Sequence, residues 1–219
     1  SPKPMLRRLS QPLVVTSLLT LLAACSSMYY STMEAFGVEK RDILSDRVQE
    51  GRDEQLEAKE QFQSALDAFK AVAGFDGGQL QQVYDDLARE YERCADQADD
   101  VRDRIESIER VAADLFAEWH TELATFSDAK LRAQSAKLRG DTMQRYDALI
   151  DAMRKAESKM EPVLTRFHDQ VLFLKHNLNA QAVASLQDNV ISIESDVSDL
   201  VAEMEASIAE ADAFIASLG

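Results

Sequence analysis

The chain has 219 residues, with 39 acidic and 24 basic side chains and a formal net charge of −15. Acidic residues are spread along nearly the whole length, so most of the surface would repel nucleic-acid phosphates and anionic lipid headgroups. The composition therefore argues against a nucleic-acid-binding protein. It also argues against adsorption to lipid through the body of the protein.

Residues 1–24 differ in composition from the rest and are typical of a secretory signal. Arg7 and Arg8 form a short positive segment, residues 13–22 are apolar, and Leu22-Ala23-Ala24-Cys25 follows. The apolar run is too short to span a bilayer, and small residues mark a cleavage site. The segment ending in Cys25 resembles a bacterial lipobox, which implies that Cys25 becomes the lipidated first residue of the mature protein. The alternative is a buried N-terminal helix with a chance cysteine.

The lipobox resemblance also implies a location. In Gram-negative lipoproteins, an Asp after the lipidated Cys favours retention in the inner membrane, and this chain has Ser26 there. We therefore expect an outer-membrane lipoprotein that faces the periplasm and carries palmitate or similar acyl chains. More than one acyl chain gives stable anchoring. Residues 25–33 would form the lipidated tether.

Residues 80–126 carry the clearest helical pattern. Apolar or aromatic residues recur there in alternating steps of three and four, from Leu80 to Phe126, and Glu122 is the exception. This spacing on an otherwise charged segment is typical of a coiled coil. The helix would be roughly 70 Å long at about 1.5 Å per residue, and its apolar stripe needs partner helices.

Three further segments show the same periodicity, and Pro162 is the only proline after residue 24. A first helix is expected from about Met33 to Ala73, with this buried row: Leu44, Val48, Gly51, Gln55, Ala58, Phe62, Ala65, Phe69 and Val72. Its small residues would let neighbours approach closely, with Tyr and Trp side chains filling the gaps. A last helix is expected to bury Val183, Leu186, Val190, Ile193, Val197, Leu200, Met204, Ile208, Ala211, Ile215 and Leu218.

The breaks between helices are predicted from turn and cap residues. Residues 74–78 form a tight reversal, in which Gly74 suits the left-handed position after a helix. Helix two ends near Phe126, with Ser127 or Asp128 capping helix three, or else near Gly140; the end of the apolar row favours Phe126. Pro162 is expected to kink helix three rather than stop it, and Asn179 to cap helix four.

These elements predict an all-α protein, an elongated antiparallel four-helix bundle or coiled coil of long helices. The bundle forms one domain over residues 34–219 in up-down-up-down order. With the N-terminus anchored, residues 74–78 and 176–179 would lie at the distal end. Residues 127–140 would point back towards the membrane.

Two blocks of sequence carry a family resemblance. They are Cys25-Ser26-Ser27-Met28-Tyr29-Tyr30 with Phe36-Gly37-Val38-Glu39-Lys40-Arg41, and Val171-Leu172-Phe173-Leu174-Lys175-His176-Asn177-Leu178-Asn179-Ala180. Both resemble an uncharacterised family of proteobacterial lipoproteins, domain of unknown function 2959, over the whole mature chain. The resemblance implies an envelope address, and the family has no established activity to assign to any residue of this chain.

The sequence predicts no catalytic, metal or cofactor site. It has no phosphate-binding glycine loop and no nucleophile elbow. His120, His168 and His176 lack ligand spacing, and the pairs Asp85-Asp86 and Asp99-Asp100 lack calcium-loop spacing. Cys94, on the apolar row of helix two, is expected to be a buried packing thiol, with an intermolecular disulfide as the alternative.

Two surfaces are candidates for contacts. Lys130, Arg132, Lys137 and Arg139 lie in a locally basic stretch that would meet headgroups or cell wall, or else form an ordinary mixed helix surface. Leu172 and Phe173, beside Lys175 and His176, are either buried all round or form an exposed docking patch for an envelope protein.

The predicted function is a non-enzymatic, lipid-anchored scaffold or adaptor of the cell envelope. The alternative is a periplasmic regulatory partner that binds and controls an envelope enzyme through the distal tip. An enzyme with a site inside the bundle would need inward-facing carboxylates or histidines. Only Glu122 and Gln55 interrupt the apolar rows.

Overall fold

The computed structural model describes residues 39–218, so the predicted signal peptide, Cys25, the tether and the expected start of helix one near Met33 lie outside the described residues. The elements are α2 (Lys40–Ala73), α3 (Leu80–Glu122), a short 3-10 helix η1 (Leu123–Thr125), α4 (Ala129–His176) and α5 (Ala180–Leu218). Residues 39–218 contain no strand. None of the helices in this range is long and apolar enough to cross a membrane.

The chain divides into two units, one ending at Ile43 and one beginning at Leu44. In the described part of the first, the Glu39 carbonyl accepts hydrogen bonds from the backbone N–H groups of Asp42 and Ile43, at 2.9 and 3.1 Å. These bonds form the first turn of α2. The bundle described below belongs to the second unit.

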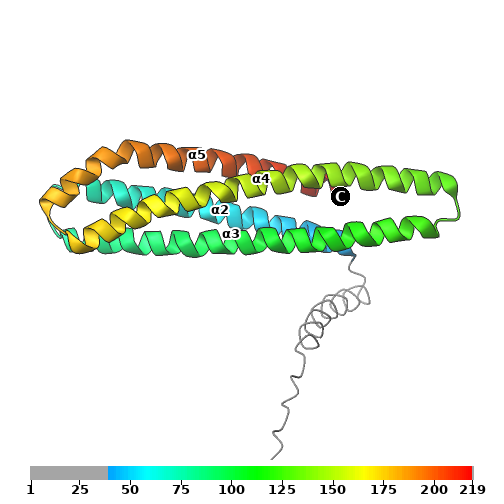
Figure 1. Cartoon of the computed structure of the whole chain (residues 1–219), viewed down its shortest axis with the longest axis horizontal. Helices are drawn as coiled ribbons and strands as arrows, with labels where there is room; N and C mark the ends of the chain where they lie inside the picture. Colours follow the sequence, from blue (N-terminus) through cyan, green and yellow to red (C-terminus); the bar gives the residue numbers. More distant parts are fainter. Residues whose placement is uncertain (1–38, 219) are drawn as a thin grey trace, which may run out of the picture. The chain divides into compact units, whose positions relative to one another are not determined.

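From Leu44 onward, the long helices form a closed ring of antiparallel neighbours (Figure 1). One ion pair marks each side of the ring: Glu50–Arg104 at 3.1 Å, Glu109–Arg154 at 2.6 Å, Arg166–Asp196 at 2.8 Å and Arg52–Asp212 at 2.8 Å. Along the α2–α5 side, Arg52, Lys59 and Lys70 pair with Asp212, Glu205 and Glu194, in reversed chain order. The predicted all-α antiparallel four-helix bundle is confirmed.

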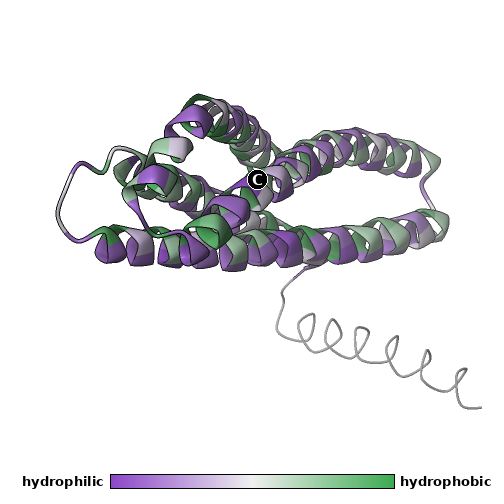
Figure 2. Ribbon diagram, turned by 60° about the vertical axis from the view of Figure 1, so that its left-hand side comes forward, coloured by the Kyte–Doolittle hydropathy of each residue, from purple (hydrophilic) through white to green (hydrophobic). Residues whose placement is uncertain are grey.

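The apolar core, rather than these surface pairs, holds the helices in register. Partly exposed ion pairs stabilise by at most about 1 kcal/mol each. By contrast, burying one Leu or Phe side chain stabilises by about 1.5–3 kcal/mol. All nine positions predicted to be buried in α2 are buried. Hydrophobic and hydrophilic residues alternate along every helix in Figure 2, as expected where each helix buries one stripe.

The core of α5 differs from the prediction in its second half. Ser207 is fully buried and Phe214 is 2 % exposed, whereas Ile208 and Ile215 are only half-buried. The buried residues Leu200, Met204, Ser207, Ala211 and Phe214 alternate strictly in steps of four and three. The prediction took the more apolar of two neighbouring residues. The regular spacing of four and three residues along the helix instead determines which of the two neighbours faces the core.

The helix ends follow the predicted cap residues. Helix α3 ends at Glu122 and η1 at Thr125, which confirms the break near Phe126. The Asp128 carboxylate accepts hydrogen bonds from the N–H groups of Lys130 and Leu131, at 2.7 and 3.2 Å. Asn179 caps α5 in the same way. Helix α4 continues through Pro162.

The turn after α2 differs from the prediction at Gly74. Positive φ angles occur at Gly77 (156°) and Gly78 (115°), not at Gly74. The Gly74 N–H donates to the Lys70 carbonyl at 2.9 Å. This helical hydrogen bond keeps Gly74 in line with α2, so the two later glycines provide the reversal.

Small residues of α2 do allow close approach, but aliphatic side chains fill the space. A Cβ atom on Gly51 would lie 2.8 Å from Cδ1 of Ile108 and 3.6 Å from Cε of Met153. The expected Tyr or Trp contact is therefore wrong at Gly51. Trp119 lies elsewhere, where its indole N–H donates to the Ser135 hydroxyl of α4 at 2.8 Å.

Two polar side chains are buried without a hydrogen-bond partner among the described residues. Both amide atoms of Gln55 and the hydroxyl of Ser207 are unpaired, and both residues are 0 % exposed. They lie at the same level of the bundle, between the Arg52–Asp212 and Lys59–Glu205 ion pairs. Leaving a buried polar group unpaired costs about 1–3 kcal/mol.

We therefore expect Gln55→Leu to raise the free energy of unfolding by about 1–3 kcal/mol, because it removes the unpaired amide at similar volume. The melting temperature should rise by about 2–4 °C per kcal/mol for a chain of this size. Thermal unfolding followed by circular dichroism measures this. Gln49→Leu, at an exposed site on the same helix, should change stability by less than about 0.5 kcal/mol. A lower melting temperature for Gln55→Leu would show that the amide is satisfied in solution.

Cys94 is fully buried, and its thiol donates to the Gln61 carbonyl at 3.4 Å. Burial is the main cause that raises the pKa of this thiol to about 12. The thiol is therefore protonated at neutral pH. A buried thiol cannot reach a second chain without unfolding, which supports the predicted packing role over an intermolecular disulfide.

We expect the Cys94 thiol of the folded Cys25→Ala chain to react at least roughly a hundredfold more slowly with Ellman's reagent than a free cysteine at pH 8, since the thiolate is the nucleophile. The rate should become normal in denaturant. The measurement is the absorbance of the released thiolate. Fast labelling of the folded chain would contradict the buried position.

Candidate functional site

The distal tip surface consists of Leu172, Phe173, Lys175 and His176, at the end of α4. Leu172 is 45 % exposed and Phe173 is 42 % exposed. Leu174, which precedes Lys175 in the sequence, is fully buried. Lys175 and His176 are exposed. The structure thus brings together the apolar patch and the cationic rim that the sequence offered as one of two interpretations. The docking role of this surface stays a prediction.

The backbone of the tip is well capped. The Asn177 N–H donates to the Leu174 carbonyl at 3.1 Å, and its side-chain amide donates to the Phe173 carbonyl at 3.0 Å. These bonds satisfy carbonyls that a helix end leaves open. The exposed Leu172 and Phe173 side chains are therefore carried on a regular helical turn. A partner would meet a preformed surface.

Three aromatic rings close the core at the opposite end. Phe116, Tyr146 and Phe214, one each from α3, α4 and α5, pack edge to face with ring centroids 5.6 and 6.4 Å apart. Burial, followed by the charges of Glu109 and Asp147, raises the pKa of Tyr146 to about 12. The phenol is therefore neutral at physiological pH. This cluster is the last layer of the core in which α5 takes part.

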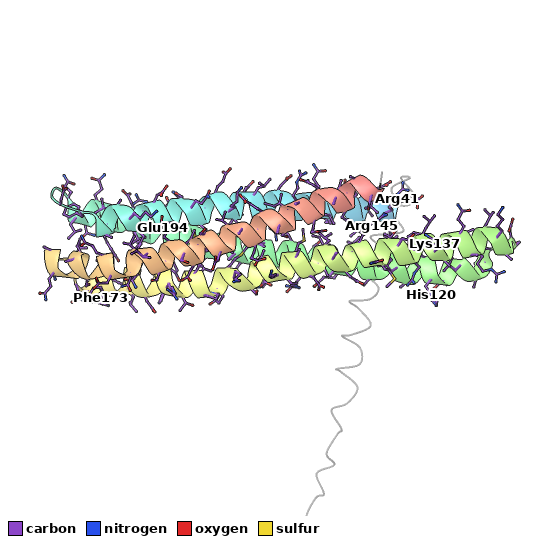
Figure 3. The ribbon with its side chains drawn as sticks, turned by 90° about the horizontal axis from the view of Figure 1, so that it is seen from above. Arg41, His120, Lys137, Arg145, Phe173 and Glu194 are labelled. Atoms are coloured by element: carbon purple, nitrogen blue, oxygen red, sulfur yellow. The ribbon has the colours of Figure 1, made fainter. Side chains whose placement is uncertain are left out.

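Past this aromatic layer and the last described turn of α5, α3 and α4 continue as a projection of two described helices, which we call the arm (residues 117–141). Figures 1 and 3 show α3 and α4 reaching past the C-terminal end of α5, with Lys137 and His120 on the projecting part. The Trp119–Ser135 hydrogen bond joins its two helices. At its base, the Arg139 guanidinium lies 6.0 Å above the Phe116 ring and donates to the Phe116 carbonyl at 3.1 Å.

All four basic residues of the predicted headgroup or wall surface lie on the arm, but they differ in availability. Lys130, Arg132 and Lys137 are exposed, and Lys137 pairs with Asp141 at 2.7 Å. Arg139 is half-buried and held against Phe116. Its main role is therefore to fasten the base of the arm. Lys130 and Arg132 are open to an anionic partner, and Lys137 is exposed but paired with Asp141.

The arm also exposes two leucines that the sequence reasoning did not identify. Leu131 is 51 % exposed and Leu138 is 52 % exposed. A signal for them was present, because Ala-Lys-Leu-Arg occurs at 129–132 and again at 136–139. A repeat of seven residues places equivalent side chains on one helix face.

A shallow groove of about 410 Å³ lies between α3 and α4 near the middle of the bundle. In it, Nδ1 of His168 lies 3.0 Å from the Tyr91 hydroxyl, with ring centroids 5.5 Å apart. Burial, then Glu161 and Glu92, raises the pKa of Tyr91, so the phenol remains a hydrogen-bond donor. The pair joins two helices. A raised pKa leaves less of the phenolate, the form that acts as a base or nucleophile, at neutral pH.

Other charged side chains of the described residues gather in ion-pair networks, such as Glu109, Arg154, Glu157 and Arg102. Within residues 39–218, no group of three His, Cys, Asp or Glu side chains is arranged to hold a metal ion. His120 and His176 are exposed at opposite ends. The acidic residues are instead paired with arginines or lysines across helix seams, as with Glu109 and Arg154.

Comparison with known proteins places the chain in a family. A family model described as a protein of unknown function, DUF2959, matches residues 29–218. No curated protein and no solved structure matches the chain.

Proposed function

Because the chain belongs to the DUF2959 family, whose function is unknown, we propose a function from its own surfaces: a lipid-anchored, non-enzymatic scaffold or adaptor of the cell envelope. In this proposal the bundle connects a membrane at its arm end with a protein partner at its distal tip. Cys25 provides the lipid anchor at the periplasmic face of the outer membrane.

The distribution of exposed apolar side chains carries this proposal. Within the described residues, the exposed large apolar side chains are Leu131, Leu138, Leu172, Phe173 and Ile191. The first two are on the arm, the next two end α4, and Ile191 lies in the distal third of α5. The middle of the bundle exposes none. Exposed apolar side chains gathered in patches mark contact sites, and here they gather towards the two ends.

Chain connectivity supports an anchor at the arm end. Glu50 of α2 pairs with Arg104, so Leu44 lies close to the base of the arm. Residues 26–43 connect Cys25 to Leu44. They span at most roughly 65 Å at about 3.6 Å per residue. A lipid on Cys25 would therefore hold Leu44 within about that distance of the membrane, and the arm end is the end of the bundle nearer to this attachment.

Lipidation is tested by metabolic labelling with an alkyne analogue of palmitate, comparing the wild-type chain with Cys25→Ala. The proposal expects label in wild type only, and recovery of the wild-type chain in the outer-membrane fraction. Equal labelling of the two chains, or a cytoplasmic wild-type protein, would refute the anchor. Cys94→Ala is the matched control and should keep the label.

The scaffold role is tested by crosslinking in cells from a photoreactive amino acid at Phe173. We expect a discrete crosslinked product that disappears when Leu172→Asp is added. A probe at Asp103, exposed in the middle of the bundle, should give no such product. The same product from both probes, or none from Phe173, would overturn the role of the tip.

The alternative function is a regulator that controls an envelope enzyme through the same tip. The exposure of Leu172 and Phe173 favours a protein partner. It is equally consistent with a scaffold and with a regulator. The two differ in the effect on the partner. A regulator changes the turnover of the crosslinked enzyme when the purified wild-type chain is added, and Leu172→Asp loses that effect. A scaffold leaves turnover unchanged.

A further inference from the structure

We infer that the α4 side of the arm binds the surface of an anionic lipid membrane directly, with Leu131 and Leu138 entering the headgroup boundary and Lys130, Arg132 and Lys137 contacting lipid phosphates. This inference deepens the proposed function, on which it rests for the choice of a membrane as partner. It assigns a second, non-covalent membrane contact besides the lipid on Cys25.

The local charge is the first argument. From Ala129 to Gly140, α4 carries four basic residues and no acidic residue, in a chain of net charge −15. The nearest acids on this helix are Asp128, which caps its first turn, and Asp141, which pairs with Lys137. Glu118 and Glu122 lie on the α3 side of the arm. The basic surface is therefore confined to one side of a short projection.

The order of the residues is the second argument. In the repeated Ala-Lys-Leu-Arg, each residue turns about 100° around the helix axis from the one before. Leu131 and Leu138 therefore form a row, with Lys130 and Lys137 on one side and Arg132 and Arg139 on the other. An exposed apolar row flanked by Lys130, Lys137 and Arg132 is typical of amphipathic helices that lie at a membrane interface, whereas Arg139 stays against Phe116.

The position of the leucine row is the third argument. Further along α4, Arg166 occurs at the same heptad position as Leu131 and Leu138, and it pairs with Asp196 of α5. The leucines therefore lie on the side of α4 that faces α5. Phe214 of α5 contacts Tyr146 of α4, and α5 ends at Leu218. On the arm, the described part of α5 does not reach this row, and the leucines are about half exposed.

A second copy of the chain fits this surface less well. Two arms related by a two-fold axis would bring the Lys and Arg rows of one α4 against the same rows of the other. Like charges at close range oppose such pairing. An anionic surface instead meets the cations and the leucines together. The arm also lies at the end of the unit where the chain from Cys25 arrives.

Trp119 provides a local probe of the contact. It is the only tryptophan of the chain and lies inside the arm, bonded to Ser135 of α4. Its emission therefore reports on the arm alone, even if the apolar residues 13–22 also bind lipid. The full Cys25→Ala chain is used, so that acylation does not contribute.

The experiment titrates this chain with vesicles of equal parts phosphatidylcholine and phosphatidylglycerol, and with vesicles of phosphatidylcholine alone. We expect a change in Trp119 emission with the anionic vesicles only, reversed by high salt. The double variants Leu131→Gln/Leu138→Gln and Lys130→Gln/Lys137→Gln should each weaken the apparent affinity at least about tenfold. Both alter exposed side chains, so the melting temperature should stay within a few degrees of the parent chain.

The matched controls are Leu172→Gln/Phe173→Gln at the tip and Lys159→Gln/Lys175→Gln outside the arm, which should bind as the parent chain does. Equal binding to both vesicle types, or undiminished binding by both arm variants, would overturn the inference. A dimer in analytical ultracentrifugation that dissociates on Leu131→Gln/Leu138→Gln would also overturn it, because the row would then bind a second copy. Tip crosslinking is independent of these measurements, so failure of the arm contact and failure of the scaffold role are distinguishable.

Discussion

Leu174→Asp is expected to destabilise the bundle by roughly 4 kcal/mol or more. Leu174 is fully buried where the last turn of α4 meets the core. The substitution removes a large apolar side chain and introduces a carboxylate with no partner, and both changes are costly. The melting temperature should fall by about 2–4 °C per kcal/mol. Thermal unfolding by circular dichroism measures this fall.

Leu172→Asp is the matched control, two residues away on the same turn. Its side chain is 45 % exposed, so the carboxylate remains in water and stability should change by less than about 0.5 kcal/mol. The crosslink from Phe173 should nevertheless disappear. A large loss of stability in Leu172→Asp would show that the side chain is buried in solution, and would remove the distal tip surface as a docking site.

Gly51→Leu is expected to destabilise the protein by about 1–3 kcal/mol or more, because it forces a side chain into a filled core. A single Cβ atom at this position already lies 2.8 Å from Cδ1 of Ile108. Further carbon atoms would displace both Ile108 and Met153, which come from different helices. Gly51→Ala should cost less, since the contacted atom is the free end of the Ile108 side chain. Chemical denaturation of both variants provides the free energies of unfolding.

Gly140→Ala is the control for helix propensity. Gly140 lies within α4, and nothing lies within 4 Å of the position of an added Cβ atom. Replacing it by alanine should stabilise by up to about 1 kcal/mol. We expect the free energy of unfolding to fall for Gly51→Leu and to rise for Gly140→Ala. This difference would separate the effect of core packing from that of backbone entropy. A neutral Gly51→Leu would mean that α2 packs less closely against α3 and α4 than the structure shows.

The two surfaces lie at opposite ends of the bundle because of its topology. In an antiparallel ring, the α2–α3 and α4–α5 turns share one end, and the α3–α4 turn lies at the other. On the arm, α3 and α4, at 43 and 48 residues, extend past Leu218, the last described residue of α5. Among the described residues, this extension is a two-helix surface on a four-helix bundle. Its basic, leucine-bearing side is the part that we assign to lipid.

The helices, their breaks and most of the core could be predicted from the sequence. Apolar residues repeat in steps of three and four because that spacing forms one stripe on a helix, and Asp128 and Asn179 satisfy N–H groups that only a helix start leaves open. These are local effects, readable within a few turns. The end of the apolar row also placed the end of helix two near Phe126 rather than Gly140.

The burial of each residue in an apolar row depends on the neighbouring helices. It therefore became visible only in the folded structure. Ser207 is buried and Ile208 is not, because α5 keeps a straight stripe against its neighbours. Leu131 and Leu138 follow the heptad spacing, yet they are exposed because the described part of α5 does not reach them. Leu172 and Phe173 left two interpretations open for the same reason. The register of the helices is set by packing between segments that are distant in the sequence. This packing determines which apolar side chains of the arm and the distal tip surface remain exposed.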